Sequence, residues 1–142
     1  MKTIKEVLEV KGGEVHSIGP DALVFDALKL MAEKEIGALV VLEDERLVGI
    51  VSERDYARKV ILKGRSSRDT KVREIMATRV LCTEPGQGVE ECMALMTDKR
   101  VRHLPVMDAG ELVGIVSVGD MVKSIIAEQK FVIDQLVSYI TG

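Results

Sequence analysis

The chain has 142 residues, of which 46% are hydrophobic and 30% are charged, as in an ordinary soluble globular domain. Its net charge of -3 gives no electrostatic basis for binding nucleic acid or an anionic membrane surface. Only 3% of the residues are aromatic and Trp is absent, so the core must be built from Val, Leu, Ile and Met.

The targeting and cysteine patterns favour a cytoplasmic protein. The N-terminal MKTIKEVLEV lacks the apolar stretch of a signal peptide, and the longest apolar run, at 37–42, is too short to span a bilayer. The two cysteines, Cys82 and Cys92, form no C-x-x-C pattern, so neither a structural disulfide nor a metal site is expected. A reducing compartment fits this cysteine usage.

The first half of the chain predicts the element order β-α-β-β-α. A short apolar segment, VHSI, precedes a turn and a helix whose apolar residues Val24, Ala27, Leu28 and Met31 have the spacing of one helical face. Two strands, ALVVL and RLVGIVS, follow and are joined by a charged turn at 43–45. Their nearly continuous apolar runs predict sheets that are covered on both faces. A second helix begins after Ser52.

A second copy of this pattern follows at an offset of 65 residues. The ranges 17–58 and 82–123 align without a gap and share 14 identities in 42 positions. The copy contains VLCT, a helix, and the strands HLPVM and ELVGIVS, joined by a tight hairpin at 108–110. Upstream, IKEVL matches VREIM after a shift of three residues. Such internal similarity indicates a duplication.

The segment KGRSSRDTK between the copies has the composition of an exposed linker. We therefore expect a first repeat at 1–64, a linker at 65–71 and a second repeat at 72–142. One copy is too small to bury its aliphatic faces, so the two should pack around a shared core. The predicted fold class is α/β (α+β), with two β-α-β-β-α repeats as a pseudo-symmetric pair and an extended C-terminal helix.

The C-terminal extension, MVKSIIAEQKFVIDQLVSYITG, is longer than one helix of a small domain needs to be. Its apolar residues fall mostly on one helical stripe, and we expect a break near 129–130. Two alternatives are open for this stripe: it packs across its own domain, or it forms a dimer contact.

The motif S-x-x-D occurs twice, at Ser52–Asp55 and at Ser117–Asp120. As a capping box, the Ser accepts a hydrogen bond from a backbone N–H of the helix that follows. The same helix start offers unpaired N–H groups to a phosphate, and the Asp three residues on can accept from the two hydroxyls of a ribose. The residues alone favour the cap, and duplication copies a cap as readily as a site.

The duplicated units, each ending in G-h-h-[ST]-x-x-D (h, hydrophobic), resemble a tandem pair of cystathionine-beta-synthase (CBS) domains, known as a Bateman module. VRHLPVMD followed by GELVGIVSVGDMVK is similar to the second half of that family's pattern, and SERDYARKV with VREIM resembles small stand-alone bacterial CBS-pair proteins. The resemblance covers nearly the whole chain. It implies a regulatory module that binds adenosine-containing ligands and dimerises into a disc of four CBS units, and it shifts the balance for S-x-x-D towards ligand binding.

The resemblance also implies further contacts. Arg54 and Arg58 would lie near a phosphate, to which Arg offers planar bidentate donors, with a solvated helical face as the alternative. Arg102 and His103 would contact phosphate or the other repeat, with a buried, hydrogen-bonded histidine as the alternative. The base would be bordered by residues near the first strands and by neighbouring small or apolar residues: Ile18, Thr83, Gly37, Ala38, Val80 and Leu81. Because RHLPV stands where the first copy has GALVV, the two clefts cannot be chemically equivalent.

We therefore predict a cytosolic sensor that binds AMP or NAD(H), with ATP, ADP and S-adenosylmethionine as alternatives, and that regulates an effector protein or its own dimer. The function could belong to energy or redox sensing. The alternative is a protein interaction module in which S-x-x-D only caps helices. An enzyme is not expected, because the sequence contains no P-loop, no nucleophile elbow and no metal-spaced cluster.

Overall fold

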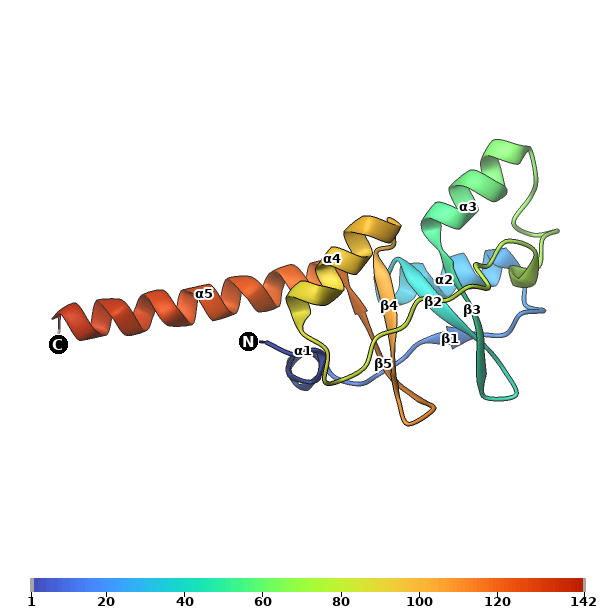
Figure 1. Ribbon diagram of the computed structural model, residues 1–142. Helices are drawn as coiled ribbons and strands as arrows, with labels where there is room; N and C mark the ends of the chain where they lie inside the picture. Colours follow the sequence, from blue (N-terminus) through green and yellow to red (C-terminus); the bar gives the residue numbers. More distant parts are fainter. Residues whose placement is uncertain (1, 142) are drawn as a thin grey trace. The chain divides into compact units, whose positions relative to one another are not determined.

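The computed structural model describes residues 2–141 of the chain (Figure 1). It divides into two compact units, one made of 15–81 and the other of 1–14 together with 82–142. Each unit combines a small sheet with helices. Mixed α/β repeats with a long C-terminal helix were predicted, and this fold class is confirmed.

The unit at 15–81 contains a three-stranded sheet in the order β1-β2-β3. Strand β1 pairs parallel with β2, and β2 pairs antiparallel with β3. Its core gathers buried apolar side chains, among them Met31, Leu39, Val51 and Ile75. The elements are β1 (Ser17–Ile18), α2 (Val24–Lys34), β2 (Ala38–Glu43), β3 (Arg46–Ser52), α3 (Glu53–Lys59) and two 3₁₀ turns (Ile61–Lys63 and Val72–Glu74).

The other unit contains a two-stranded antiparallel sheet, β4-β5. The strand expected at VLCT is reduced to one bridging residue: the N–H of Thr83 donates to Pro105 O at 2.9 Å, and Met107 N donates to Thr83 O at 2.9 Å. Pro105 stands where β2 has Val40, the partner of Ser17. Proline has no N–H to donate, so the ladder cannot extend to Cys82. The elements are α1 (Ile4–Lys11), α4 (Val89–Lys99), β4 (His103–Asp108), β5 (Glu111–Ser117) and α5 (Val118–Thr141).

The two hairpins repeat each other in detail. Both carry a register shift at the same place, between Val41 and Leu42 and between Val106 and Met107. Both turn through two residues of positive φ, at 44–45 (51° and 65°) and at 109–110 (51° and 81°). Two consecutive positive φ angles match the twist of flanking antiparallel strands. The duplication seen in the sequence therefore extends to backbone conformation.

Each hairpin has a glycine where another segment approaches closely. A Cβ at Gly49 would lie 2.7 Å from Met76 Sδ, and one at Gly114 would lie 2.7 Å from Leu8 Cδ2. Leu8 ends the IKEVL segment and Met76 ends VREIM, so each segment packs on a hairpin that is not the one following it in its own repeat. The compact units thus exchange segments relative to the sequence repeats: α1 belongs with the second repeat, and 65–81 with the first.

Helix α5 runs without interruption from Val118 to Thr141, so the break expected near 129–130 is wrong. The residues around that point, Ala127, Glu128, Gln129 and Lys130, are all good helix formers, which explains the continuity. Met121, in the first turn, is fully buried. From Phe131 onward every described side chain is exposed, and the helix extends away from β4 and β5 (Figure 1). This end does not pack across its own unit.

Candidate functional site

The first S-x-x-D motif forms a reciprocal cap at the start of α3. Ser52 Oγ accepts from Asp55 N at 3.2 Å, while Asp55 Oδ2 accepts from Ser52 N at 2.9 Å and from Ser52 Oγ at 3.1 Å. Ser52 has extended backbone angles, as an N-cap residue should. The capping interpretation of this motif is therefore correct as far as local geometry goes.

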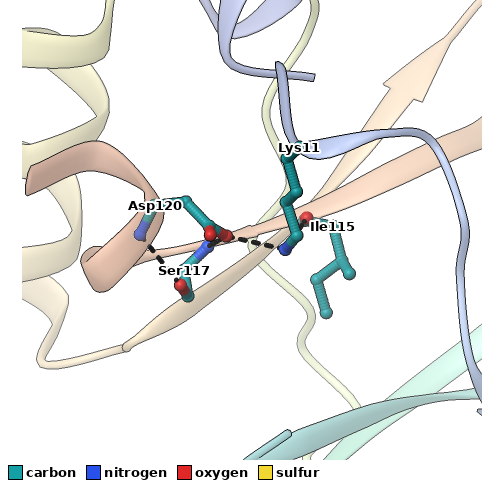
Figure 2. A network of polar contacts seen from close by, with 4 residues as sticks. All are labelled: Lys11, Ile115, Ser117 and Asp120. Atoms are coloured by element: carbon teal, nitrogen blue, oxygen red, sulfur yellow. Dashed lines mark hydrogen bonds and ion pairs between the residues drawn. The ribbon is translucent and has the colours of Figure 1, made fainter. Parts of the chain in front are cut away.

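The second motif forms the same reciprocal pair where β5 passes into α5 (Figure 2). Asp120 N donates to Ser117 Oγ at 3.1 Å, and Ser117 N donates to Asp120 Oδ2 at 2.8 Å. Both carboxylates are partly buried, with 19% of the Asp55 side chain and 18% of the Asp120 side chain exposed. A capping carboxylate that still reaches solvent can also meet a ligand.

The two carboxylates differ in the lysine that pairs with them. Asp55 Oδ1 lies 3.5 Å from the Nζ of Lys59, one turn along the same helix. Asp120 Oδ2 lies 2.6 Å from the Nζ of Lys11, which comes from the C-terminal end of α1 and also donates to Ile115 O at 2.7 Å (Figure 2). No local pattern in the sequence signals the contact between Lys11 and Asp120, because 109 residues separate them.

The contacts of Asp120 hold its pKa below the ordinary value. Burial alone would raise the pKa of this carboxyl group. The hydrogen bonds from Lys11 and from the Ser117 N–H outweigh burial, because they favour the ionised form. Asp120 is therefore a carboxylate throughout the physiological pH range.

A pocket of about 270 Å³ lies beside this carboxylate, between α1 and α5. Three lysines face one aspartate around it, and the remaining lining is apolar or small. Its lining residues are Lys2, Val7, Val10, Lys11, Asp120, Lys123, Ser124 and Ala127. The sequence pattern identified Asp120 but neither the pocket nor the contributions of Lys2 and Lys11 to it.

Of the remaining candidates in the unit at 15–81, Gly37 and Ala38 lie beside the start of α3. Gly37 O accepts from Glu53 N at 3.1 Å, and Ala38 pairs with Ser52 across the β2–β3 ladder. Arg54 and Arg58 are exposed on α3. Ile18 is half-buried and packs against the aliphatic core of this unit. Val80 and Leu81, which are half-buried, lie outside any strand at the end of the same unit.

The corresponding second-repeat positions have different chemistry. Arg102 O accepts from Val118 N at 3.0 Å, and its side chain is exposed. His103 is half-buried and pairs with Ser117 across the β4–β5 ladder. Arg102 and His103 thus take the places of Gly37 and Ala38 beside the motif. The expected chemical difference between the two sites has a structural basis.

The side chain of Thr83 lies in the core instead of lining a site. It is 2% exposed, and its hydroxyl contacts Gln87 Oε1 and, at 3.1 Å, Cys92 Sγ. Any ligand contact from Thr83 would have to come through its backbone, but both backbone groups already bond β4.

Burial raises the pKa values of the Cys82 and Cys92 thiols, so both remain protonated at neutral pH.

Within residues 2–141, no cluster of three or more His, Cys, Asp or Glu side chains is arranged to hold a metal ion. Over the same residues, none of the helices has the length and apolar character needed to cross a membrane.

Comparison with known proteins assigns the family. The CBS domain model matches residues 4–62 and 72–127. The mitochondrial CBS domain-containing protein CBSX3 of Arabidopsis thaliana is 40% identical over 149 residues, which cover 99% of this chain and 72% of that protein. The chain belongs to the CBS-domain family, as the resemblance in its sequence indicated.

Solved structures agree with this assignment. A CBS-domain protein from Burkholderia ambifaria, whose name connects it with signal transduction, superposes with a TM-score of 0.87 at 51% identity, over 90% of this chain and 96% of that one. The CBS domain pair of protein MJ0100, solved with 5'-methylthioadenosine and S-adenosyl-L-methionine, superposes with a TM-score of 0.80 at 21% identity, over 90% and 98% of the two chains. At that identity the second match shows the shared fold.

Proposed function

We propose that this protein is a regulatory module that binds adenosine-containing ligands, with AMP or NAD(H) as the first candidates and ATP, ADP and S-adenosylmethionine as alternatives. The observation that carries the proposal is the position of Asp120, a capping carboxylate that also lines a lysine-rich pocket. A carboxylate accepts ribose hydroxyls, and lysines attract phosphate. Membership of the CBS family supports the same ligand class.

In the proposed complex, Asp55 and Asp120 hold ribose, while Ser52 and Ser117 shape the helix starts. Arg54 and Arg58 serve a phosphate at the first-repeat site, and Arg102 and His103 at the second. Backbone and small or apolar residues border the base: Ile18, Gly37, Ala38, Val80, Leu81 and Thr83. For Thr83, whose hydroxyl is buried and whose N–H already donates to β4, this role is restricted to the second lone pair of its carbonyl oxygen.

The test is binding of an adenine ligand panel by thermal denaturation and calorimetry. AMP, ADP, ATP, NAD⁺, NADH, 5'-methylthioadenosine and S-adenosylmethionine are compared with GMP. A ligand at 100 times its dissociation constant should raise the free energy of unfolding by about 2.7 kcal/mol. Asp55→Asn and Asp120→Asn should weaken binding to different extents. Asp134→Asn is the matched control, because Asp134 is an exposed aspartate on the free part of α5.

Absence of a stability shift with every adenine ligand at millimolar concentration would reject the sensor proposal. So would equal affinity in wild type and both motif variants, since S-x-x-D would then be a cap alone. We propose binding and not catalysis as the activity, so ATP and NAD should be recovered unchanged after incubation with the protein.

A second function, protein interaction without nucleotide, is favoured by the exposed apolar side chains of α5. Phe131, Ile133 and Leu136 are 63%, 58% and 58% exposed. We propose a homodimer, to be tested by sedimentation with and without ligand, and an effector protein as the regulated partner. Ile133→Asp should reduce association without changing ligand affinity if this helix forms the contact.

We also propose a cytoplasmic location, supported by the cysteine usage of the sequence, because two cysteines without a C-x-x-C pattern fit a reducing compartment. The Arabidopsis relative is a mitochondrial protein by name, so fractionation has to decide between compartments.

A further inference from the structure

The carboxylate proposed to receive a ribose in the second repeat already has an internal cation. Lys11 Nζ donates to Asp120 Oδ2 at 2.6 Å, and Ser117 N donates to the same oxygen at 2.8 Å (Figure 2). A cis-diol that bonds both oxygens of a carboxylate needs Oδ1 and Oδ2 together. Because Oδ2 has two donors, a ribose in this position must displace the Lys11 ammonium.

The first-repeat carboxylate also accepts twice at Oδ2, but from the N–H and the hydroxyl of Ser52, so a ribose there displaces a neutral hydroxyl and not an ammonium. Lys59 Nζ lies 3.5 Å from Asp55 Oδ1, and its short hydrogen bond, 2.8 Å, goes to Ile75 O instead. The Lys59 side chain is 47% exposed, against 32% for Lys11. Solvent screens an exposed pair more than a partly buried one. A ribose therefore meets much stronger competition from a lysine at Asp120 than at Asp55.

A displaced Lys11 needs a new anion. It keeps its bond to Ile115 O, but it loses the carboxylate that neutralises it. Lys123 faces the same pocket, as does Lys2, which lies 3.9 Å from Glu6 Oε2. When a ribose is bound to Asp120, the only carboxylate among the described residues of the pocket lining no longer neutralises the lysines around it. A ligand phosphate restores the balance of charge, whereas an uncharged nucleoside leaves the lysines uncompensated.

We propose that Lys11 makes the second-repeat site selective for ligands that carry an anionic group beside the ribose. Binding replaces the Lys11–Asp120 ion pair by two contacts with the ligand. The ribose hydroxyls donate to Asp120, and Lys11 donates to the phosphate. AMP and the dinucleotides satisfy this exchange. Adenosine and 5'-methylthioadenosine lack the anion, and S-adenosylmethionine has a sulfonium cation beside the ribose, with its carboxylate at the far end of the methionine chain next to an ammonium. This inference rests on the proposed function and narrows its ligand class.

The test measures the affinities of AMP, adenosine and S-adenosylmethionine by calorimetry at fixed ionic strength. The full-length protein carries Asp55→Asn, which weakens the first-repeat site so that binding at the second-repeat site dominates. In this background AMP should bind at least about tenfold more tightly than adenosine, the effect expected of one charge-assisted hydrogen bond. Adding Lys11→Met should remove most of this difference, because it should weaken the binding of AMP and strengthen the binding of adenosine. Lys11→Arg should restore it. Lys130→Met, which removes an exposed lysine from α5, the helix that carries Asp120, should leave the ratio of the two affinities unchanged.

The possible failures are distinguishable. If adenine ligands bind but Lys11→Met changes AMP and adenosine by the same factor, or changes neither, Lys11 has only a structural role and the inference is wrong while the proposed function stands. If neither the parent protein nor the Asp55→Asn background binds any adenine ligand, the inference and the proposed function are both rejected. Should Lys11→Met fail to fold by circular dichroism, the Lys11→Gln and Lys11→Arg pair gives the same comparison.

Discussion

The two S-x-x-D sites have the same local geometry and different surroundings. Ser52 and Asp55 stand at the start of a seven-residue helix, and their lysine comes from that helix. Ser117 and Asp120 start a helix of 24 residues, and their lysine comes from α1 at the other end of the chain. Local hydrogen bonds thus reproduce the cap in both copies, whereas the charge beside each carboxylate depends on which distant segment packs there.

The largest difference in stability that we expect between the two regions comes from substituting the residue after each aspartate. Met121 is fully buried, whereas Tyr56 at the equivalent position is half-buried. Met121→Ala should lower the free energy of unfolding by about 2–5 kcal/mol, since it leaves a cavity in a closed core. Tyr56→Ala should cost less. Urea unfolding of both variants checks this, and equal costs would show that the start of α5 is no better anchored than α3.

The hairpin glycines should differ as well. A Cβ at Gly49 would meet the Ala77 carbonyl oxygen at 2.9 Å besides Met76, whereas at Gly114 the nearest atoms all belong to the flexible Leu8 side chain. Gly49→Ala should therefore cost about 2 kcal/mol and Gly114→Ala about 1 kcal/mol, within the range for overpacked sites. Thermal melts of the pair measure the difference. The reverse order would mean that α1 is held more rigidly on its hairpin than the 72–76 segment.

The caps themselves should contribute equally. Asp55 N and Asp120 N donate to their serines at 3.2 Å and 3.1 Å. Ser52→Ala and Ser117→Ala should each cost about 1 kcal/mol, the usual value of an N-cap side chain. Chemical denaturation of the two variants, with Ser138→Ala on exposed α5 as control, tests this. A difference above about 1 kcal/mol would contradict the view that the motif is one local structure copied twice.

The smallest effect concerns the lysines and depends on pH. Lys11→Met should cost about 0.5–1 kcal/mol at pH 7, the upper part of the range for partly exposed ion pairs, and Lys59→Met less. The pKa of Asp120 is lowered on folding, so its stabilisation is present above the unfolded value and is lost as the pH falls through the folded one. The cost of Lys11→Met should therefore shrink below about pH 4. A cost that stays constant down to pH 2 would assign it to packing of the lysine stem.

The sequence by itself determined the duplication, the β-α-β-β-α order, the hairpins and both S-x-x-D caps. All of these depend on interactions within a few residues, or on a pattern of apolar residues that repeats at a fixed offset. The family followed from the same motifs. The loss of the first strand in the second repeat was also open to prediction, because Pro105 removes the N–H that a partner strand needs.

Tertiary structure alone decided which segment packs on which hairpin, and therefore which cation meets each carboxylate. Leu8 and Met76 contact Gly114 and Gly49 through packing between segments far apart in the chain, and no local pattern encodes that choice. The same exchange carries Lys11 to Asp120 and closes one side of the pocket with α1. The continuity of α5, by contrast, was open to prediction, because the residues at 127–130 are all good helix formers.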